Sequence, residues 1–341
     1  MLQKPSIPDQ VIANRLQTDY GISAVHITFL PLGADINTAV YHIQSPNHPP
    51  YFLKLRSGPF NPAAVILPKL LQEQGLNHII APLPTTDDRL YTTLEVYTVT
   101  LSPSIEGKNN YEVTLSDQQM VQFGRLLKQF HTTQFPPSLT QTIRRETYSS
   151  HWRDLVRAYL SDLDKHASAD PISAETAAFL KTKHTETLNL VNHAERQIQT
   201  LQTQSPPFIL CHADIHAGNI HITADNTFYL IDWDTLILAP KERDLMSIGA
   251  SLMGRWRTPQ EEETLFYQGY FEDGRTSLNP IALTYYRSER IIQDIAEFCH
   301  QIFTLNGNLQ DRQQALHWLK SNYTPDSTID LAFHQPEVRP F

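Results

Sequence analysis

The chain has few cysteines and no long apolar run. Its 341 residues include two cysteines, Cys211 and Cys299, each within an apolar stretch. A disulfide framework is therefore not expected, and a reducing compartment is favoured. No apolar run approaches the roughly 18 residues of a membrane-spanning helix, and the N-terminus carries no signal-peptide pattern. We therefore expect a cytoplasmic protein without a membrane segment.

Charge is also scarce, and its balance is acidic. Charged residues make up 18% of the chain and the net charge is −9. A nucleic-acid partner is not expected, because such proteins need a basic face against the phosphates. Hydrophobic residues make up 40% and aromatic residues 10%, which excludes a disordered chain. The length favours two domains or one domain with two lobes, and the sequence leaves the oligomeric state open between monomer and dimer.

The order of the sequence patterns predicts an α+β fold. Near the N-terminus, apolar and polar residues alternate as in strands, with a helix pattern before them and another after them that contains Pro68; this proline should kink that helix or move its start downstream. A polar, turn-rich stretch at 102–110 is interpreted as a hinge. The rest is mostly helical, with a β insert at 208–231. We expect a β-rich N-lobe at 1–101 and a helical C-lobe at 111–341, with helices at 116–131, 148–164, 173–202, 242–253, 259–271, 280–303 and 309–321.

The most informative motif is His-x-Asp-x4-Asn, formed by His212, Asp214 and Asn219, with Asp232 thirteen positions later at the end of the next expected strand. Protein kinases use this spacing for phosphoryl transfer. Mg²⁺ requires hard oxygen ligands, which Asn219 and Asp232 would supply. A second carboxylate must orient the acceptor hydroxyl and take its proton, and Asp214 is placed for that role.

A strand lysine upstream fits the same interpretation. Lys54 lies between apolar neighbours in Tyr51-Phe-Leu-Lys54-Leu, and in a kinase it would contact the nucleotide phosphates. An ordinary solvent-facing lysine at a sheet edge remains the alternative. Kinases pair this lysine with a glutamate on the next helix, where Glu73 is the only candidate, and a surface glutamate is an equally good interpretation of that residue.

Taken together, these stretches resemble the aminoglycoside phosphotransferase family over nearly the whole chain. The resemblance is carried by Leu32-Gly-Ala-Asp-Ile-Asn-Thr38, Cys211-His-Ala-Asp-Ile-His-Ala-Gly-Asn219, Ile231-Asp-Trp-Asp234, Ala239-Pro-Lys-Glu-Arg-Asp-Leu-Met246 and residues 285–296. It implies a protein-kinase-like fold, with the nucleotide in a cleft between the small and large lobes.

The resemblance also implies roles for individual residues. Asp214 would be the catalytic base, His212 a structural member of the catalytic loop, and Asp244 a brace for that loop. Asn219 and Asp232 would bind Mg²⁺. The ATP would be held by Lys54, by a hinge over 100–105 that includes Ser102, and by a loop over 33–38 that contains Gly33, Asp35, Asn37 and Thr38. That loop has a single glycine, unlike the glycine-rich loop of protein kinases.

The implied reaction is ATP- and Mg²⁺-dependent phosphorylation of a hydroxyl on a small-molecule acceptor. An aminoglycoside or amino-cyclitol antibiotic is expected, spectinomycin first among them. A cationic acceptor needs carboxylates opposite its ammonium groups, which points to Arg290, Asp294 and Glu297 on one helix face. A solvated, salt-bridged helix is the alternative. Asp234 is a second acid near the metal and acceptor or, equally well, a turn residue.

Three other interpretations stay open at this point. The first is a metabolic kinase of the same fold, acting on homoserine, choline, methylthioribose or a sugar. The second is a non-catalytic kinase-like binding protein, which the intact Lys54, Asp214, Asn219 and Asp232 disfavour. The third is a zinc hydrolase that uses His212, Asp214 and His216, for which no further ligand set at fitting spacing is found.

Overall fold

The alternating apolar residues near the N-terminus form an antiparallel sheet. The computed structural model describes residues 4–31, 37–46, 48–167, 170–272, 278–304, 308–325 and 327–333. In this part of the chain the sheet has five strands in the order β1-β2-β3-β5-β4. The strands are β1 (His26–Leu30), β2 (Thr38–Gln44), β3 (Tyr51–Ser57), β4 (Thr92–Leu94) and β5 (Tyr97–Pro103).

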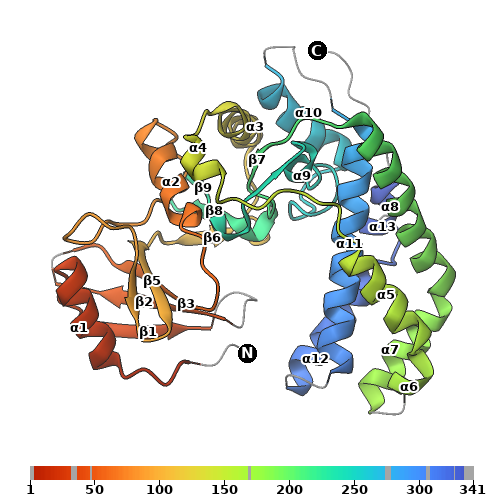
Figure 1. Cartoon of the computed structure of the whole chain (residues 1–341), viewed down its shortest axis with the longest axis horizontal. Helices are drawn as coiled ribbons and strands as arrows, with labels where there is room; N and C mark the ends of the chain where they lie inside the picture. Colours follow the sequence, from red (N-terminus) through yellow and green to blue (C-terminus); the bar gives the residue numbers. More distant parts are fainter. Residues whose placement is uncertain are drawn as a thin grey trace. The chain divides into compact units, whose positions relative to one another are not determined.

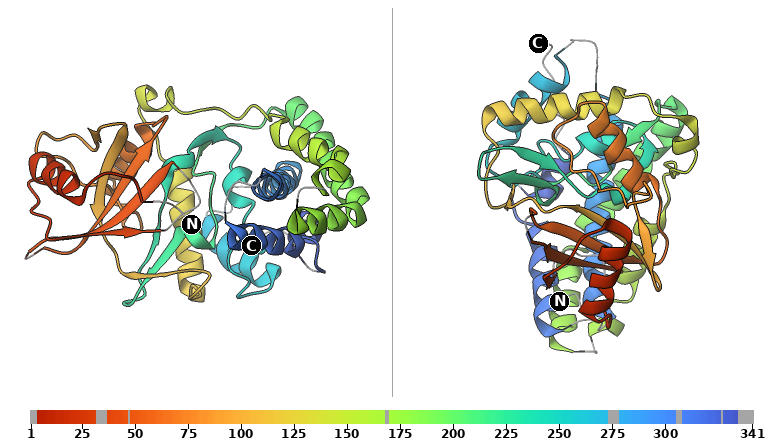
Figure 2. Two further views of the ribbon diagram at one scale, coloured as in Figure 1. Left: turned by 90° about the horizontal axis from the view of Figure 1, so that it is seen from below. Right: turned by 90° about the vertical axis from the view of Figure 1, so that its left-hand side faces the viewer.

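The two faces of this sheet have different partners. The register places Tyr41 opposite Leu53, and Leu53 opposite Leu101, so these side chains share one face. Helix α1 (Asp9–Tyr20) packs on that face through Ile12 and Leu16. Figures 1 and 2 show the helix beside the sheet. Because side chains alternate along a strand, Lys54 points to the opposite face, away from this apolar core.

The first unit of the chain contains further elements besides this sheet. They are α2 (Ala63–Glu73), β6 (Gly107–Asn109), α4 (Pro137–Thr140), β8 (Ile220–Thr223), β9 (Phe228–Leu230) and the 3-10 helix Trp233–Thr235. Strands β8 and β9 form a hairpin within the β insert expected at 208–231, and β6 adds to it, which the sequence did not indicate. Helix α2 begins at Ala63 with Pro68 inside it, so the second of the two outcomes expected for this proline, a downstream start, is wrong.

The second unit is mainly helical and is arranged around α11. Helix α11 contacts α5, α7, α8, α9, α12 and α13; in Figures 1 and 2 it lies in blue beside the green helices α5 to α8. The unit comprises α3 (Asp117–Thr132), α5 (His151–Ser161), α6 (Leu163–Ala167), α7 (Pro171–Thr182), α8 (His184–Gln204), β7 (Ile209–Cys211), the 3-10 helix Ala217–Asn219 at its boundary, β10 (Ile237–Ala239), α9 (Glu242–Leu245), α10 (Pro259–Tyr270), α11 (Pro280–Phe303), α12 (Leu309–Ser321) and α13 (Thr328–Ala332).

Three helix expectations need correction. The helix expected from residue 148 begins at His151, because Tyr148 has a left-handed backbone (φ +54°). The long helix expected over 173–202 is two helices, because the backbone at Lys183 (φ −102°, ψ 6°) leaves the helical conformation. The helix expected over 242–253 stops at Leu245, and turns follow it. The α+β composition is confirmed.

Contact density divides the chain into the same two units. The first takes in residues up to Leu115 together with Thr132–Ile143 and Gly218–Leu236, and the second takes in the rest. The position of the hinge between the two lobes stays a prediction.

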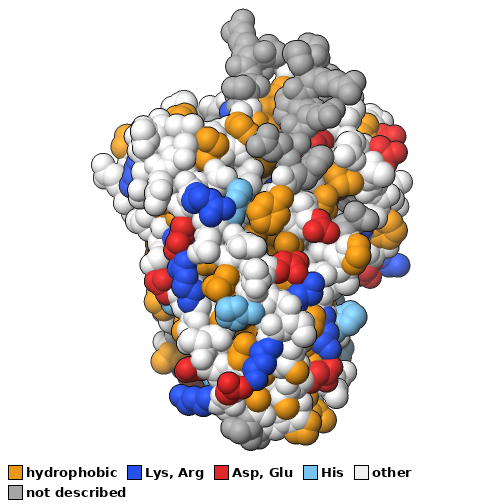
Figure 3. Space-filling model, turned by 90° about the vertical axis from the view of Figure 1, so that its right-hand side faces the viewer, with side chains coloured by type: hydrophobic (Ala, Val, Ile, Leu, Met, Phe, Trp, Pro, Cys, Tyr) orange, Lys and Arg blue, Asp and Glu red, His pale blue; other side chains and the backbone are white. Residues whose placement is uncertain are grey.

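None of the helices in the described ranges has the length and apolar composition to cross a membrane. Figure 3 shows basic and acidic side chains intermixed on one face of the molecule.

Candidate active site

Lys54 is held by two carboxylates. Its Nζ donates to Asp232 Oδ1 at 3.2 Å and makes a second hydrogen bond to Asp234. Arg56, two residues further along β3, lies 3.3 Å from Asp234 through Nη2. Burial lowers the pKa of Lys54, but the two carboxylates outweigh burial and leave it above the ordinary value. Lys54 therefore stays a cation, directed toward the turn after β9.

The turn after β9 presents its two acids differently. Asp232 has a left-handed backbone with φ +63°. Next to it, Trp233 is buried and its indole N–H donates to the carbonyl of Leu230 at 3.3 Å. The side chain of Asp232 is 46% exposed, whereas that of Asp234 is 18% exposed. Asp232 is thus the more open carboxylate, and Asp234 is the one enclosed by cations.

The hairpin brings Asn219 and Asp232 to the same end. Ile220 pairs with Leu230 in the β8–β9 ladder, and the N–H of Ile231 donates to the carbonyl of Asn219 at 3.0 Å. Asn219 precedes the first strand of this hairpin and Asp232 follows the second, as the sequence predicted. An amide oxygen and an open carboxylate are hard ligands, so the donor chemistry of this hairpin end suits Mg²⁺.

Asp214 makes two contacts with cationic or titratable groups. Its Oδ1 accepts from Arg290 Nη1 at 2.9 Å, and its Oδ2 lies 3.6 Å from His216 Nε2. Arg290 also donates through Nε to Asp294 at 3.0 Å. Burial raises the pKa of Asp214, but His216 and Arg290 outweigh it and hold this pKa well below its usual range. Asp214 is therefore an ionised acceptor over the whole physiological range.

The backbone next to Asp214 is fastened by Asp244. Asp244 Oδ2 accepts the N–H of His212 at 2.8 Å and Oδ1 accepts that of Ala213 at 2.6 Å. Ala213 has φ +68°, which costs about 1–2 kcal/mol for a residue with a Cβ. The N–H of Asp214 donates to His212 Nδ1 at 3.3 Å. Asp244 and the fully buried His212 thus fix the approach to Asp214.

Behind Asp244 lies a second layer that the sequence analysis missed. His131, at the end of α3, has Nε2 at 2.9 Å from Asp244 Oδ2 and Nδ1 at 2.7 Å from the hydroxyl of Tyr270. Cys211 lies close by, and the side-chain ligand atoms of His131, Cys211 and Asp244 are within 4.8 Å of one another. Both ring nitrogens of His131 and both oxygens of Asp244 already have hydrogen-bond partners, so the trio is a polar brace.

The residues predicted for the acceptor have separate partners. Asp234 contacts Lys54, whereas Arg290 and Asp294 form a chain with Asp214. Glu297 is exposed and accepts a hydrogen bond from Gln293 at 2.8 Å. Burial raises the pKa of Asp294 even with Arg290 beside it. The structure therefore brings Arg290 and Asp294 to Asp214 and leaves Glu297 at the surface.

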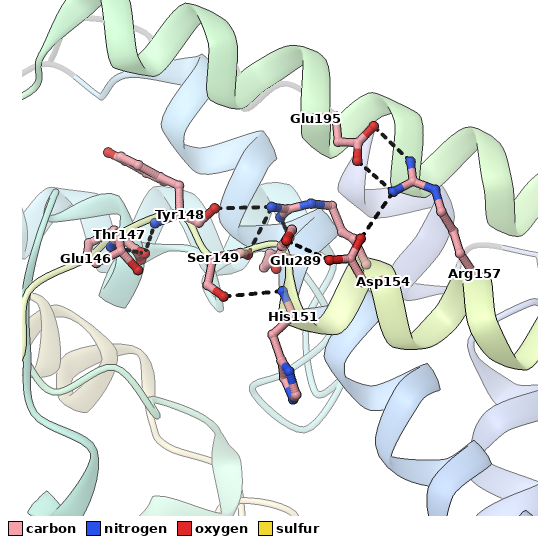
Figure 4. Close-up of polar contacts among 11 residues, drawn as sticks. Glu146, Thr147, Tyr148, Ser149, His151, Asp154, Arg157, Glu195 and Glu289 are labelled. Atoms are coloured by element: carbon pink, nitrogen blue, oxygen red, sulfur yellow. Dashed lines mark hydrogen bonds and ion pairs between the residues drawn. The ribbon is translucent and has the colours of Figure 1, made fainter.

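Immediately before Arg290 on α11, Glu289 fastens the segment that leads into α5. Glu289 pairs with Arg153, whose Nη2 also donates to the carbonyls of Tyr148 and Ser149 at 3.2 and 2.9 Å. Figure 4 shows Glu289 facing this segment, with Arg157 reaching Glu195 on α8. Burial raises the pKa of Glu289 to about 7 despite Arg153. These contacts connect α5 with both α11 and α8.

Of the residues expected to hold the nucleotide, four can be placed. Thr38 pairs with Arg56 at the start of β2, and the carbonyl of the preceding Asn37 accepts the N–H of Ser57 at 2.8 Å. Ser102 pairs with Phe52, two positions before Lys54, so Ser102 and Lys54 lie on the same face of the sheet. Gly33 and Asp35 lie outside the described residues.

Glu73 does not pair with Lys54. It lies at the last position of α2 and is 3.4 Å from Lys69 Nζ, with its side chain 55% exposed. The surface interpretation of Glu73 is the one that the structure supports. No other acid occurs between Ala63 and Glu73. The carboxylates that reach Lys54 come instead from the turn after β9.

Comparison with known proteins identifies relatives of this chain. The profile of the phosphotransferase enzyme family matches residues 28–281. A crystal structure of spectinomycin phosphotransferase in complex with ADP and spectinomycin is 32% identical and matches 97% of this chain and 99% of its own, with a TM-score of 0.89. Its AMP-bound complex is also 32% identical and matches 95% and 98%, with a TM-score of 0.83. The expected kinase-like fold is confirmed.

More distant matches agree on the fold. An amicoumacin kinase is 17% identical over 95% of this chain and 94% of its own, with a TM-score of 0.63, and this likeness concerns the fold alone. Among curated sequences, the uncharacterized protein sll1119 of Synechocystis sp. is 29% identical over 123 residues, which is 35% of this chain. This chain spans only 29% of the length of that protein.

Proposed function

Because the chain belongs to the phosphotransferase enzyme family and is a phosphotransferase with an alcohol group as acceptor, we propose that it transfers the γ-phosphoryl group of ATP to a hydroxyl of spectinomycin or a related amino-cyclitol. The observation that carries this proposal is the pair of similar structures with bound spectinomycin or nucleotide, at 32% identity over almost the whole chain. The geometry around Lys54 and Asp214 supports the same reaction. We further propose that the protein acts in the cytoplasm and confers resistance to the antibiotic.

On the donor side, Lys54 would contact the phosphates from the sheet face that also carries Ser102. Asn219 and Asp232 would hold Mg²⁺, whose chemistry is to neutralise the phosphate charge that grows as the bond to the leaving ADP breaks. Asn37 and Thr38, with Gly33 and Asp35, would complete the nucleotide loop. These residues position and neutralise the donor, and no covalent enzyme intermediate is needed.

On the acceptor side, Asp214 would accept the hydrogen bond of the reacting hydroxyl. The hydroxyl oxygen forms the new bond to phosphorus, the bond from phosphorus to ADP breaks, and the hydroxyl proton passes to Asp214. The pKa of Asp214 is held low by His216 and Arg290 against the effect of burial, so it is a weak base. A weak base suits a loose transition state, in which the proton leaves late and orientation matters most.

For the acceptor itself, Asp294 and Glu297 are proposed as carboxylates for its ammonium groups, with Asp234 and Arg290 as the other residues of the predicted set. Arg290 is already engaged by Asp214 and Asp294. Its role toward the acceptor would therefore be indirect, through the carboxylates that it holds. The alternative is a metabolic kinase of the same fold that takes homoserine, choline, methylthioribose or a sugar.

A coupled ADP-release assay tests the proposal. The purified protein is given Mg²⁺ and ATP with spectinomycin, several aminoglycosides, homoserine, choline or methylthioribose, and Asp214→Ala is the control. We expect turnover with spectinomycin that the Asp214→Ala variant loses while it still binds ATP. Turnover with a metabolic acceptor alone would establish the alternative. ATP binding without transfer to any acceptor would indicate a non-catalytic binding protein, and zinc in the purified protein would support the hydrolase.

A further inference from the structure

The two acids of the Asp232-Trp233-Asp234 turn have different surroundings. Trp233 is buried between them, so the turn is fixed at its centre. Asp232 is about half exposed, and its described ion pair is the 3.2 Å contact with Lys54. Asp234 is mostly buried and contacts both Lys54 and Arg56. One acid is open to a ligand, and the other is enclosed by protein cations.

The enclosing cations come from one face of one strand. Lys54 and Arg56 are two residues apart on β3, so their side chains point to the same side of the sheet. Two cations and two carboxylates balance in charge at this point. If a metal takes the open Asp232, Lys54 still keeps Asp234 as a partner. Lys54 then keeps one carboxylate partner and remains on the sheet face that also carries Ser102.

The usual anchor of such a lysine is missing. Kinases supply a glutamate from the helix that follows the lysine strand. In this chain that helix is α2, whose single acid, Glu73, lies at the surface beside Lys69. Helix α2 instead contacts the turn Trp233–Thr235 through its packing. The helix thus supports the turn, and the turn holds the lysine.

We propose that Asp234 is the positioning residue for Lys54, replacing the helix carboxylate, and that Asp232 is left free for the metal. This assignment rests on the proposed function, since it requires donor phosphates at Lys54. It changes the role expected for Asp234 from acceptor binding to alignment of the donor. Arg56 takes part because it forms a second ion pair with the Asp234 carboxylate.

Steady-state kinetics test the assignment with Asp234→Asn, Asp234→Glu, Lys54→Met and the double variant Asp234→Asn/Lys54→Met. A misplaced lysine costs rate more than affinity, so we expect Asp234→Asn to lower kcat roughly 10- to 100-fold with little change in the KM for ATP. The double variant should be no slower than Lys54→Met, because Asp234 acts through Lys54 and has nothing to position once the lysine is replaced. Asp234→Glu should recover part of the rate.

Two controls separate this role from others. Glu73→Gln should leave kcat unchanged; a loss equal to that of Asp234→Asn would restore the helix carboxylate and overturn the proposal. Calorimetry of ADP binding with and without Mg²⁺ should show that Asp234→Asn keeps the gain in affinity from Mg²⁺, whereas Asp232→Asn loses it. Loss of that gain in Asp234→Asn would make Asp234 a metal ligand.

The proposal can also fail separately from the proposed function. If the native protein transfers phosphate to no acceptor, the function is wrong, but the pair can still be measured by urea denaturation of the native protein, the two single variants and the double variant. We expect the double variant to lose less stability than the sum of the single losses. Fully additive losses would overturn the pairing of Asp234 with Lys54.

Discussion

Asp244 accepts the N–H of Ala213 at 2.6 Å, at a backbone position that a residue with a Cβ adopts only at a cost. Asp244 therefore compensates local strain one residue before Asp214. It does so from a fully buried site, where a carboxylate without partners would carry a large desolvation free energy. The hydrogen bonds with His131 and with the two backbone N–H groups offset that desolvation.

Asp244→Asn should destabilise the protein and disorder the approach to Asp214. The amide can accept from one of the two N–H groups but presents its NH₂ to the other, which leaves a buried donor unsatisfied. A buried group left in this way costs about 1–3 kcal/mol. Urea denaturation measures the loss. A variant as stable as the native protein would show that the brace is dispensable.

Arg290→Gln should lower kcat and move the acid limb of the pH–rate profile to higher pH. His216 and Arg290 hold the pKa of Asp214 down against burial, so removing Arg290 lets this pKa rise and Asp214 becomes protonated at a higher pH. The pH dependence of kcat checks this. Arg157→Gln, which removes a surface pair with Glu195, is the control. A raised acceptor KM with an unmoved profile would instead place Arg290 in acceptor binding.

Glu262→Gln should stabilise the protein at alkaline pH. Burial raises the pKa of Glu262 to about 7, and its Oε1 accepts the N–H of Gly249 at 2.7 Å, a bond that glutamine can keep. The native state then binds more protons than the unfolded state between about pH 4.5 and pH 7, so this group lowers stability as pH rises through that window.

Above pH 7 the Glu262→Gln variant should exceed the native protein by up to roughly 3 kcal/mol, since each pKa unit corresponds to about 1.4 kcal/mol. Below pH 4.5 the two should be nearly equal. Denaturation curves at pH 5, 6, 7 and 8 measure the difference. Glu175→Gln, at an exposed pair with Lys320, should give no such trend; an equal trend would contradict the role of burial.

Gly269→Ala should destabilise the contact between α3 and α10. A Cβ at Gly269 would lie 1.9 Å from the carbonyl oxygen of Val121, and one at Gly124 would lie 2.1 Å from that of Phe266. Alanine gains helix propensity, but the backbones must move apart, and overpacking costs about 1–3 kcal/mol. Thermal unfolding of Gly269→Ala, compared with the exposed change Gln118→Ala on α3, checks this. An unchanged Tm would mean that the helices separate freely.

Local patterns were enough to predict much of this fold. The alternation around Lys54 predicted the sheet, and the helix expected from residue 116 is α3, where the hydroxyl of Ser116 accepts the N–H of Gln119 at 3.3 Å. The spacing of Asn219 and Asp232 was informative because a hairpin joins them directly, so the sequence separation determines how they meet. Helices α11 and α12 follow the predicted bounds for the same reason: their caps and periodicity are local.

What sequence could not supply are contacts made across long separations. Lys54 and Asp234 are 180 residues apart, and His131 and Asp244 are 113 apart. No local pattern distinguishes Asp234 from a turn residue or His131 from a helix-end histidine, because their partners are determined by sheet register and helix packing.

The surface position of Glu73 has a consequence for control. In kinases that pair the strand lysine with a helix glutamate, swinging that helix outward separates the two charges and turns the enzyme off. Here an outward shift of α2 would break no ion pair of Lys54 among the described residues. A movement of α2 would thus reach Lys54 only through the packing of this helix on the turn Trp233–Thr235, and not by separating a charged pair.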